Sequence, residues 1–293
     1  MKNSYFFKLR IILEFILVYL VYLILFFLPI TFVSYLGGSL FKLIGPHTKT
    51  NNIVRKNLST ILPNEKDSEI NRLAKESWIN TGKTFFELLI LPKIIKKNYK
   101  VKIEGKKYLE QIKANNEKVI FISIHQSNWE ILLPSIDILG VAVGGIYRHI
   151  NNPYIDKLIL RIRKKSVFSN NSFYTPKGKK SAKDIIDGIN RDISIVLLID
   201  QKDSAGEFID LFNKPSKTQI GFIKIARKHN MKIIPVENIR DKNDSFKLKF
   251  YPPLKKFNNN VSDKEIMKEI HNIVEKWIKS HPSSWFLQHN RFS

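Results

Sequence analysis

Cysteine is absent from the 293-residue chain, and acidic residues are few. Without a thiol the protein forms no disulfide, has no thiolate zinc site and uses no cysteine nucleophile. Only 26 Asp and Glu stand against 49 Lys and Arg, which gives a formal net charge of +23 at pH 7. This excess predicts an acidic partner: an anionic membrane, a phosphorylated lipid, an acidic protein or nucleic acid. A soluble surface that is merely rich in lysine is the alternative interpretation.

Several motifs of known chemistry are missing as well. The chain has no G-x-S-x-G nucleophile elbow, no H-E-x-x-H zinc motif and no G-x-x-x-x-G-K-[ST] phosphate loop. Its seven histidines are scattered, so we expect neither a metal nor a cofactor. Basic and aromatic residues do not interleave as they do in nucleic-acid-binding segments, so nucleic acid is not an expected partner.

Charge is nearly missing from residues 11–33, where Glu14 is the only charged residue. A helix of this length can cross the ~30 Å hydrocarbon core of a bilayer. A cleaved signal peptide is the competing interpretation, but the stretch is long for one and lacks a small-x-small cleavage site. We therefore expect residues 1–45 to form a membrane-anchoring segment.

Two arrangements of this segment remain open. Either a single helix spans the membrane, or Pro29 turns a hairpin whose arms cover residues 11–28 and 30–45. Basic residues flank the segment on both sides, so the positive-inside rule does not fix its orientation: Lys2, Lys8, Arg10, Lys42, Lys49, Arg55 and Lys56. The strongly basic remainder of the chain favours a main body on the cytoplasmic side, against anionic lipid.

The rest of the chain divides by its pattern of apolar residues. Residues 46–100 are predicted to be a helical lead-in, in which 50–98 are helical and apolar residues recur at helical spacing over 69–91, until Pro92. Residues 101–293 alternate short apolar runs with helices, which predicts an α/β domain with a mostly parallel central sheet flanked by helices. The predicted strands are 118–124, 141–147, 194–199, 232–236 and 245–251, and a last helix is predicted over 263–279.

Helix starts are predicted where a serine is followed, three residues later, by an acid or an amide, because such a pair caps the first turn. The pattern occurs at Ser127–Glu130, Ser181–Asp184, Ser216–Gln219 and Ser262–Glu265. The first of these pairs, Ser127–Glu130, would begin a helix directly after a predicted strand.

That strand, 118–124, ends at His125, and Glu130 follows. On a regular helix these two side chains would face different directions, so they meet only if the chain turns between them, as at a strand-to-helix junction. There a histidine can act as a general base and a carboxylate can orient it. A buried, hydrogen-bonded His125 and a capping role for Glu130 are the structural alternatives. A helix that begins at Ser127 would nevertheless be the turn that brings Glu130 back to His125.

Two further predicted strands end in polar side chains, at Arg148 and at Asp200. Because the carboxyl ends of parallel strands share one edge of a sheet, where α/β proteins bind ligands, we expect both residues to lie near His125. A guanidinium can grip a phosphate through two hydrogen bonds. A surface ion pair of Arg148 with Asp156, and a simple strand-end role for Asp200, are the alternatives.

The order of these motifs resembles that of the bacterial lipid A late acyltransferases, the lauroyl/myristoyl transferase family within the lysophospholipid acyltransferase-like superfamily. The resemblance covers nearly the whole chain; each piece is short, and their order and spacing carry it. The pieces are Arg55-Lys56-Asn57-Leu58, Asn80 to Glu87, Ile124 to Glu130, Tyr147-Arg148 with Asn152-Pro153 and Asp156, Asp200-Gln201, Phe212 to Pro215, Thr218, Gly221, Ala226-Arg227, His281 to Trp285, and Arg291.

The resemblance implies a glycerolipid acyltransferase-like fold and an O-acyltransferase without a cofactor. An acyl chain on an acidic acyl carrier protein would pass to a hydroxyl of a phosphorylated glycolipid, a lipid A precursor, at the cytoplasmic face of the bacterial inner membrane. His125 would remove the hydroxyl proton, and Glu130 would orient the imidazole. The residues expected to contact the substrate or its phosphate are Arg148, Tyr147, Asp200, Asn128 and Gln201.

Two other functions remain open. A lysophospholipid, aminolipid or glycolipid acyltransferase would apply the same chemistry to another acceptor. Against it, glycerophosphate acyltransferases carry a Pro-Glu-Gly-type motif where this chain reads Asp200-Gln201-Lys202. A basic, membrane-bound binding protein without turnover is the more remote alternative, and an intact His125 and Glu130 argue against it.

Overall fold

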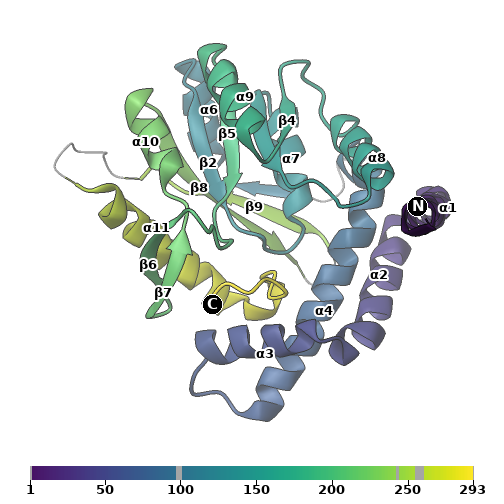
Figure 1. Ribbon diagram of the computed structural model, residues 1–293. Helices are drawn as coiled ribbons and strands as arrows, with labels where there is room; N and C mark the ends of the chain where they lie inside the picture. The colour runs from purple at the N-terminus through teal and green to yellow at the C-terminus, as the bar shows by residue number, and fades with distance from the viewer. Residues whose placement is uncertain (1, 97–100, 242–243, 255–260, 293) are drawn as a thin grey trace.

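A seven-stranded sheet forms the centre of the computed structural model, which describes residues 2–96, 101–241, 244–254 and 261–292 (Figure 1). The strand order is β1-β9-β8-β2-β5-β3-β4, and neighbours run parallel except β8 and β9. The strands are β1 (Val101–Glu104), β2 (Val119–Ser123), β3 (Val143–Tyr147), β4 (Phe173–Pro176), β5 (Ser194–Leu198), β8 (Lys232–Arg240) and β9 (Phe246–Phe250). The predicted α/β class with a mostly parallel sheet is thereby confirmed.

All five predicted strands are present, as β2, β3, β5, β8 and β9, although β8 continues past its predicted end to Arg240. Four strands were not predicted. β1 and β4 are four-residue strands at the two edges of the sheet. β6 (Glu207–Leu211) and β7 (Lys214–Thr218) form a separate antiparallel hairpin. These strands are short or rich in charged residues, so they lack the continuous apolar run by which a buried strand is recognised.

Helices cover both faces of the sheet (Figure 1). Ile120 and Ile122 of β2 pack in one core cluster with the helices α9 to α11, whereas Val119 and Phe121 pack in a second cluster with α6 and α7. This alternation explains why β2 is buried along its whole length. The helices are α6 (Lys106–Ala114), α7 (Leu132–Ile138), α8 (Pro153–Lys164), α9 (Lys179–Asn190), α10 (Gly221–Lys228) and α11 (Asp263–Ser280), with short 3-10 turns η1 (Gly45–His47), η2 (Trp129–Ile131) and η3 (Pro282–Ser284).

The predicted lead-in is helical, as α3 (Thr50–Ile61), α4 (Asp67–Leu89) and α5 (Leu91–Lys96). The helix predicted over 69–91 ends at Leu89, two residues before its predicted end and just ahead of Pro92. The chain breaks at Ile90, and Pro92 sits in the first turn of α5, where its missing N–H is not needed. The predicted helix end at 97–98 and the domain boundary at residue 100 lie outside the described residues.

The N-terminal segment is broken at Pro29 into α1 (Lys2–Phe27) and α2 (Ile30–Ile44). Within α1, Phe6–Phe27 is long and apolar enough to cross a membrane, judged by length and composition. α2 packs along α4, where two glycines meet: a Cβ added to Gly82 would lie 2.2 Å from the carbonyl oxygen of Gly37. Glycine is required at this contact because any side chain would force the helices apart.

Of the predicted helix caps, one is confirmed. The hydroxyl of Ser262 accepts a hydrogen bond from the N–H of Glu265 at 3.2 Å, and the Glu265 carboxylate accepts one from the N–H of Ser262 at 2.8 Å. The predicted caps at Ser181 and Ser216 are wrong. Ser181 lies inside the first turn of α9, which begins after Gly178, and Ser216 lies in β7.

Candidate active site

His125 and Asp200 meet at the carboxyl edge of the sheet, because β2 and β5 are parallel neighbours. His125 Nδ1 lies 2.7 Å from Asp200 Oδ1, and the same oxygen accepts the backbone N–H of His125 at 3.1 Å. A carboxylate in this position favours the tautomer in which Nδ1 carries the proton and Nε2 keeps its lone pair. His125 therefore offers a basic nitrogen on a side chain that is 17% exposed.

Asp200 is held as an anion by its surroundings. Only 2% of its side chain is exposed, and its second oxygen accepts a hydrogen bond from Trp285 Nε1 at 2.7 Å. Burial by itself raises the pKa of Asp200, but the charge of His125 and the hydrogen bonds from His125 and Trp285 outweigh it and leave the pKa below its usual value. An ionised Asp200 can stabilise the imidazolium that forms when Nε2 takes a proton.

The C-terminal segment fixes the loop that carries His125. Gln126 pairs with Trp285 in an antiparallel bridge. The carbonyl of His125 accepts the N–H of Phe286 at 2.8 Å, and the N–H of Ser127 donates to the carbonyl of Ser284 at 2.8 Å. Trp285 was singled out in the sequence only through the family resemblance, and nothing in the local pattern indicated that it would contact Asp200.

Glu130 contacts Arg163 of α8 and not the imidazole of His125. Its two oxygens accept hydrogen bonds from Arg163 Nη2 at 2.7 Å and Nε at 2.8 Å. Burial by itself raises the pKa of Glu130, but the charge and hydrogen bonds of Arg163 outweigh this effect. The pKa therefore lies below its usual value, and the carboxyl is ionised at neutral pH. The structure thus corrects the expected contact: the direct partner of His125 Nδ1 is Asp200, and Glu130 is held in a largely buried ion pair beside them.

Arg163 is a site residue that sequence reasoning missed. It lies in α8 among Arg161 and Lys164, a pattern that is typical of a solvated helix face. In the fold its guanidinium stacks over the ring of Tyr147, 5.5 Å from the centroid, while it binds Glu130. Tyr147, expected to contact substrate, is 8% exposed and so acts here as packing for Arg163.

Asn128 and Ser127 support the loop after β2 from within. Asn128 is 0% exposed; its amide donates to Glu87 at 2.8 Å, and its Oδ1 accepts the N–H of Glu130 at 3.1 Å. Asn128 therefore caps η2, in place of the predicted Ser127, and is not placed to contact substrate as expected. Ser127 adopts a left-handed backbone (φ 53°), and its hydroxyl accepts the N–H of Arg240 at 3.0 Å.

Glu87 of α4 connects this loop to the N-terminal helices. Both of its oxygens accept hydrogen bonds from Arg240, each at 2.7 Å, and one also accepts the hydroxyl of Ser34 of α2 at 2.6 Å. With Asn128 on the other oxygen, the buried carboxylate joins α2, α4, β8 and the loop after β2. The network explains the fixed position of the chain directly after His125.

Gln201 and Arg148 lie at the same edge of the sheet. Gln201 Nε2 is 3.4 Å from His125 Nε2, so its amide lies within hydrogen-bonding distance of that nitrogen. Arg148 follows β3, which is the next parallel neighbour of β5, and its side chain is exposed. The three strand ends expected at one edge thus belong to adjacent parallel strands, in the order β2, β5 and β3.

Aromatic rings border the imidazole on its other side. The ring centroid of His125 lies 5.3 Å from that of Trp129 and 6.3 Å from that of Phe286, and Phe85 contacts both of these rings. Phe85 is 40% exposed, and it also contacts Phe41 of α2. An apolar, partly exposed surface thus leads from His125 to α4 and α2.

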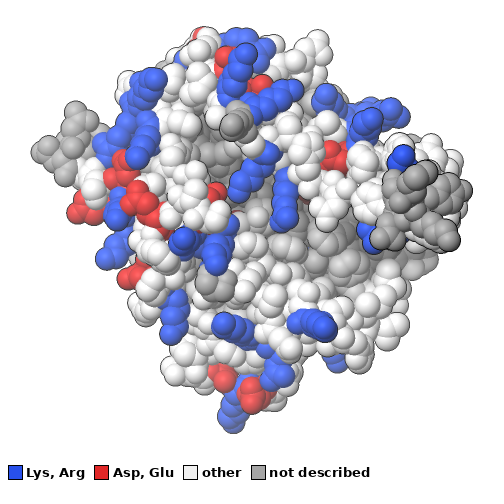
Figure 2. Space-filling view, viewed as in Figure 1, with Lys and Arg blue, Asp and Glu red and all other residues white. Residues whose placement is uncertain are grey.

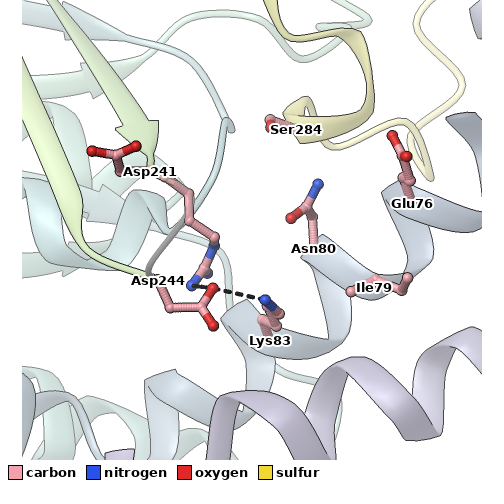
Figure 3. A pocket seen from close by; sticks show the side chains of 8 residues that line it. Glu76, Ile79, Asn80, Lys83, Asp241, Asp244 and Ser284 are labelled. Atoms are coloured by element: carbon pink, nitrogen blue, oxygen red, sulfur yellow. Dashed lines mark hydrogen bonds and ion pairs between the residues drawn. The ribbon is translucent and has the colours of Figure 1, made fainter. Parts of the chain in front are cut away.

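A polar hollow of ≈ 420 Å³ lies between α4, the end of β8 and η3 (Figure 3). Lys83 points across it to Asp244, with Nζ 2.7 Å from a carboxylate oxygen. The other lining residues are Glu76, Ile79, Asn80, Arg240, Asp241 and Ser284. None of the predicted site residues lines this hollow.

Basic side chains dominate the charge on the face seen in Figure 2, where Lys and Arg outnumber Asp and Glu. Over the part of the chain that the structure describes, no group of three or more His, Asp or Glu side chains is arranged to hold a metal ion.

Comparisons with known proteins found one matching family and a similar solved structure. The family model described as bacterial lipid A biosynthesis acyltransferase matches residues 2–293. Among solved structures, the chain is similar to the 1-acyl-sn-glycerophosphate (LPA) acyltransferase PlsC from Thermotoga maritima, at 15% identity and a TM-score of 0.40, over 87% of this chain and 96% of that one. No curated protein matches the sequence.

Proposed function

Because the chain belongs to the bacterial lipid A biosynthesis acyltransferase family, we propose that it moves an acyl chain from acyl carrier protein to a hydroxyl of a lipid A precursor. The observation that carries this proposal is the contact of His125 Nδ1 with Asp200, which favours a lone pair on Nε2 beside an apolar aromatic surface. No covalent enzyme intermediate and no cofactor are required.

In the proposed reaction, His125 Nε2 takes the proton of the acceptor hydroxyl as its oxygen attacks the thioester carbonyl. The C–O bond forms, the C–S bond breaks, and the imidazolium returns the proton to the leaving thiolate. Asp200 orients the ring and stabilises its charged form, and a base positioned in this way contributes ~10²–10⁴-fold to the rate. The Glu130–Arg163 pair supports the loop and places a further carboxylate near the imidazolium.

The donor and the acceptor are proposed to reach His125 from different sides. Trp129, Phe286 and Phe85 offer an apolar surface for the acyl chain, which extends towards α2. Arg148, exposed at the end of β3, is placed to bind a phosphate of the glycolipid, and Gln201 to contact the acceptor hydroxyl. The net charge of +23 suits both an acidic carrier protein and anionic lipid.

We place the enzyme at the bacterial inner membrane with its catalytic domain facing the cytoplasm. The apolar α1 and the basic remainder of the chain support this location. The same chemistry on a lysophospholipid, aminolipid or glycolipid acceptor is the second candidate function. A basic membrane-bound binding protein without turnover is disfavoured by a base held in a reactive tautomer.

An acceptor panel tests the proposal. Purified enzyme in detergent is given labelled acyl-carrier-protein donor and, in parallel, a lipid A precursor and a lysophospholipid, with His125→Ala as the blank. We expect the wild type to acylate the lipid A precursor and the blank to show none above background. Acylation of the lysophospholipid alone would assign the second function, and no transfer to any acceptor would favour the binding protein.

A further inference from the structure

Helix α1 has two different faces. One stripe packs against the rest of the molecule and consists of Ile11, Phe15, Val18, Tyr22 and Leu25, with Leu28 directly after the helix. The opposite stripe consists of strongly exposed apolar residues: Leu13 at 56%, Leu17 at 65%, Leu20 at 52%, Ile24 at 62% and Phe27 at 82%. Both stripes follow the i, i+3/i+4 spacing of one helix face.

The inner stripe is attached along its length to the catalytic domain. Near its start, Asn152 at the beginning of α8 donates to the carbonyl of Ile11 at 2.8 Å and to Glu14 at 3.2 Å. The rings of Phe15 and Tyr154 lie 5.6 Å apart. Further along, the stripe joins a core cluster with apolar residues of α4, α5 and α8: Leu88, Ile90, Leu91, Ile94, Leu158, Ile159 and Ile162.

The end of α1 is attached as well. Lys93 of α5 donates to the carbonyl of Phe26 at 3.1 Å and to that of Leu28 at 2.5 Å. From Ile11 to Leu28 a helix extends about 25 Å. A membrane-spanning helix would place about 30 Å of its length in the hydrocarbon core. The catalytic domain lies against nearly all of that length of α1.

A spanning orientation would take charged residues into the hydrocarbon with α1. The helix that lies against it, α8, carries exposed Lys157, Arg161 and Lys164. Charged side chains at that depth are strongly unfavourable and are found paired or lining water-filled cavities. At the level of lipid headgroups, by contrast, the same cations face anionic phosphates.

α2 offers a second apolar surface at the same edge of the molecule. Its exposed residues include Phe32, Tyr35, Leu40, Leu43 and Ile44. Figure 1 shows α1 almost end-on and α2 running down the same side of the molecule beside α4, so that one plane along this side touches both helices.

We infer that α1 does not cross the membrane but lies in its interface, with the stripe from Leu13 to Phe27 in lipid and both ends of the helix on the cytoplasmic side. The lysine and arginine residues on both flanks of the apolar stretch suit contact with anionic headgroups. It also resolves the orientation left open by the sequence, because basic residues before and after the apolar stretch then lie on one side. The inference does not depend on which acceptor the enzyme uses.

The absence of cysteine makes the topology directly measurable. Ser4→Cys, placed before the apolar stretch, and Ala114→Cys, on the exposed end of α6, are made as separate single-cysteine proteins. Each is labelled with a membrane-impermeant maleimide in sealed inner-membrane vesicles of both orientations, and total cysteine is measured after adding detergent. We expect both positions to react in inside-out vesicles and to be protected in right-side-out vesicles. Reaction of the two positions from opposite sides would overturn the inference.

A depth profile gives a second readout that does not depend on the reactivity of Ser4→Cys. Nitroxide labels are placed singly at Leu13, Leu17, Leu20 and Ile24, in protein that retains acyltransferase activity, and their immersion is measured from oxygen and nickel-chelate collision rates. An interfacial helix gives similar, shallow depths at all four positions. A depth that rises to a maximum in the middle of the helix and falls again would show a span and contradict the inference.

Discussion

At the scale of single residues, the site depends on which side chain touches the base. His125, Asp200 and Trp285 form a chain of hydrogen bonds in which each bond is 2.7 Å long and Asp200 is buried. Glu130 lies nearby but is occupied by Arg163. The two carboxylates therefore have separate partners: Asp200 contacts the imidazole of His125, and Glu130 balances the buried guanidinium of Arg163.

Asp200→Asn should leave the fold intact and lower kcat. The asparagine amide can donate to His125 Nδ1, which favours the tautomer with the proton on Nε2 and removes the base. We expect kcat to fall by ~10²–10⁴-fold with a much smaller change in KM. The measurement is steady-state acyl transfer, with circular dichroism to verify folding; an Asp200→Asn enzyme with wild-type kcat would contradict the assigned contact.

Glu130→Gln should act mainly on stability. It leaves the Arg163 guanidinium buried without a partner, which typically costs about 3–5 kcal/mol of unfolding free energy. Replacing both partners, as Glu130→Gln with Arg163→Met, should recover most of that loss because no charge remains buried. Thermal unfolding in detergent compares the three proteins. If the double variant is no more stable than Glu130→Gln, the ion pair is not the cause.

At the scale of elements, the catalytic loop is held by three parts of the chain that are distant in sequence. Glu87 of α4 connects it to α2 through Ser34 and to β8 through Arg240. The C-terminal segment holds it from the other side through Trp285 and Phe286. Close packing of α2 against α4 is thus part of what positions His125.

Adjacent glycines of α2 provide a matched test of that packing. A Cβ at Gly37 would lie 2.4 Å from the backbone oxygen of Gly82, whereas a Cβ at Gly38 would lie 3.1 Å from the end of the Ile79 side chain. Gly37→Ala should destabilise the protein by about 1–3 kcal/mol through overpacking. Gly38→Ala should be near neutral, since alanine favours the helix. Equal melting temperatures for the two variants would refute the close contact.

Helix α11 contributes a pH-dependent contact with the β6–β7 hairpin. His271 is buried and its Nδ1 lies 2.7 Å from the carbonyl oxygen of Asp210. Burial lowers the pKa of His271 from 6.5 to about 4. Between these values the unfolded chain binds a proton that the folded protein does not, so stability falls as the pH drops from 6.5 towards 4.

We expect this single group to reduce the free energy of unfolding by about 3 kcal/mol across that range. His271→Asn keeps a side-chain donor for Asp210 but removes the titration. Urea unfolding gives the free energy of unfolding of the wild type and of His271→Asn at each pH between 7 and 4. We expect the wild type to lose stability relative to His271→Asn as the pH falls. Parallel curves would show that His271 titrates normally in the folded state.

At the scale of the whole molecule, the parts that could be predicted are those with strong, continuous patterns. The apolar run at 118–124 and its neighbours predicted the central parallel strands, and the polar residues that end them predicted where the site would lie. The edge strands β1 and β4 and the β6–β7 hairpin were not predicted, because they are short and half exposed. The contacts of Arg163 and Trp285 in the site were not predicted for another reason. They join segments that are far apart in the sequence, and no local pattern indicates them.

The family identifies this molecule as an acyltransferase, and its long apolar N-terminal helix is consistent with association with a membrane. The network around Glu87 connects α2 and α4, which carry exposed apolar residues, to the loop that holds His125 and Trp129. The central claim is that His125 is the base of acyl transfer.

Acyl transfer by His125→Ala tests that claim most directly. Wild type and His125→Ala are purified in the same detergent, matched by melting temperature and given saturating acyl-carrier-protein donor with a lipid A precursor. The account predicts that kcat of the variant is at least ~10²-fold lower. A folded His125→Ala enzyme that turns over at the wild-type rate would contradict it.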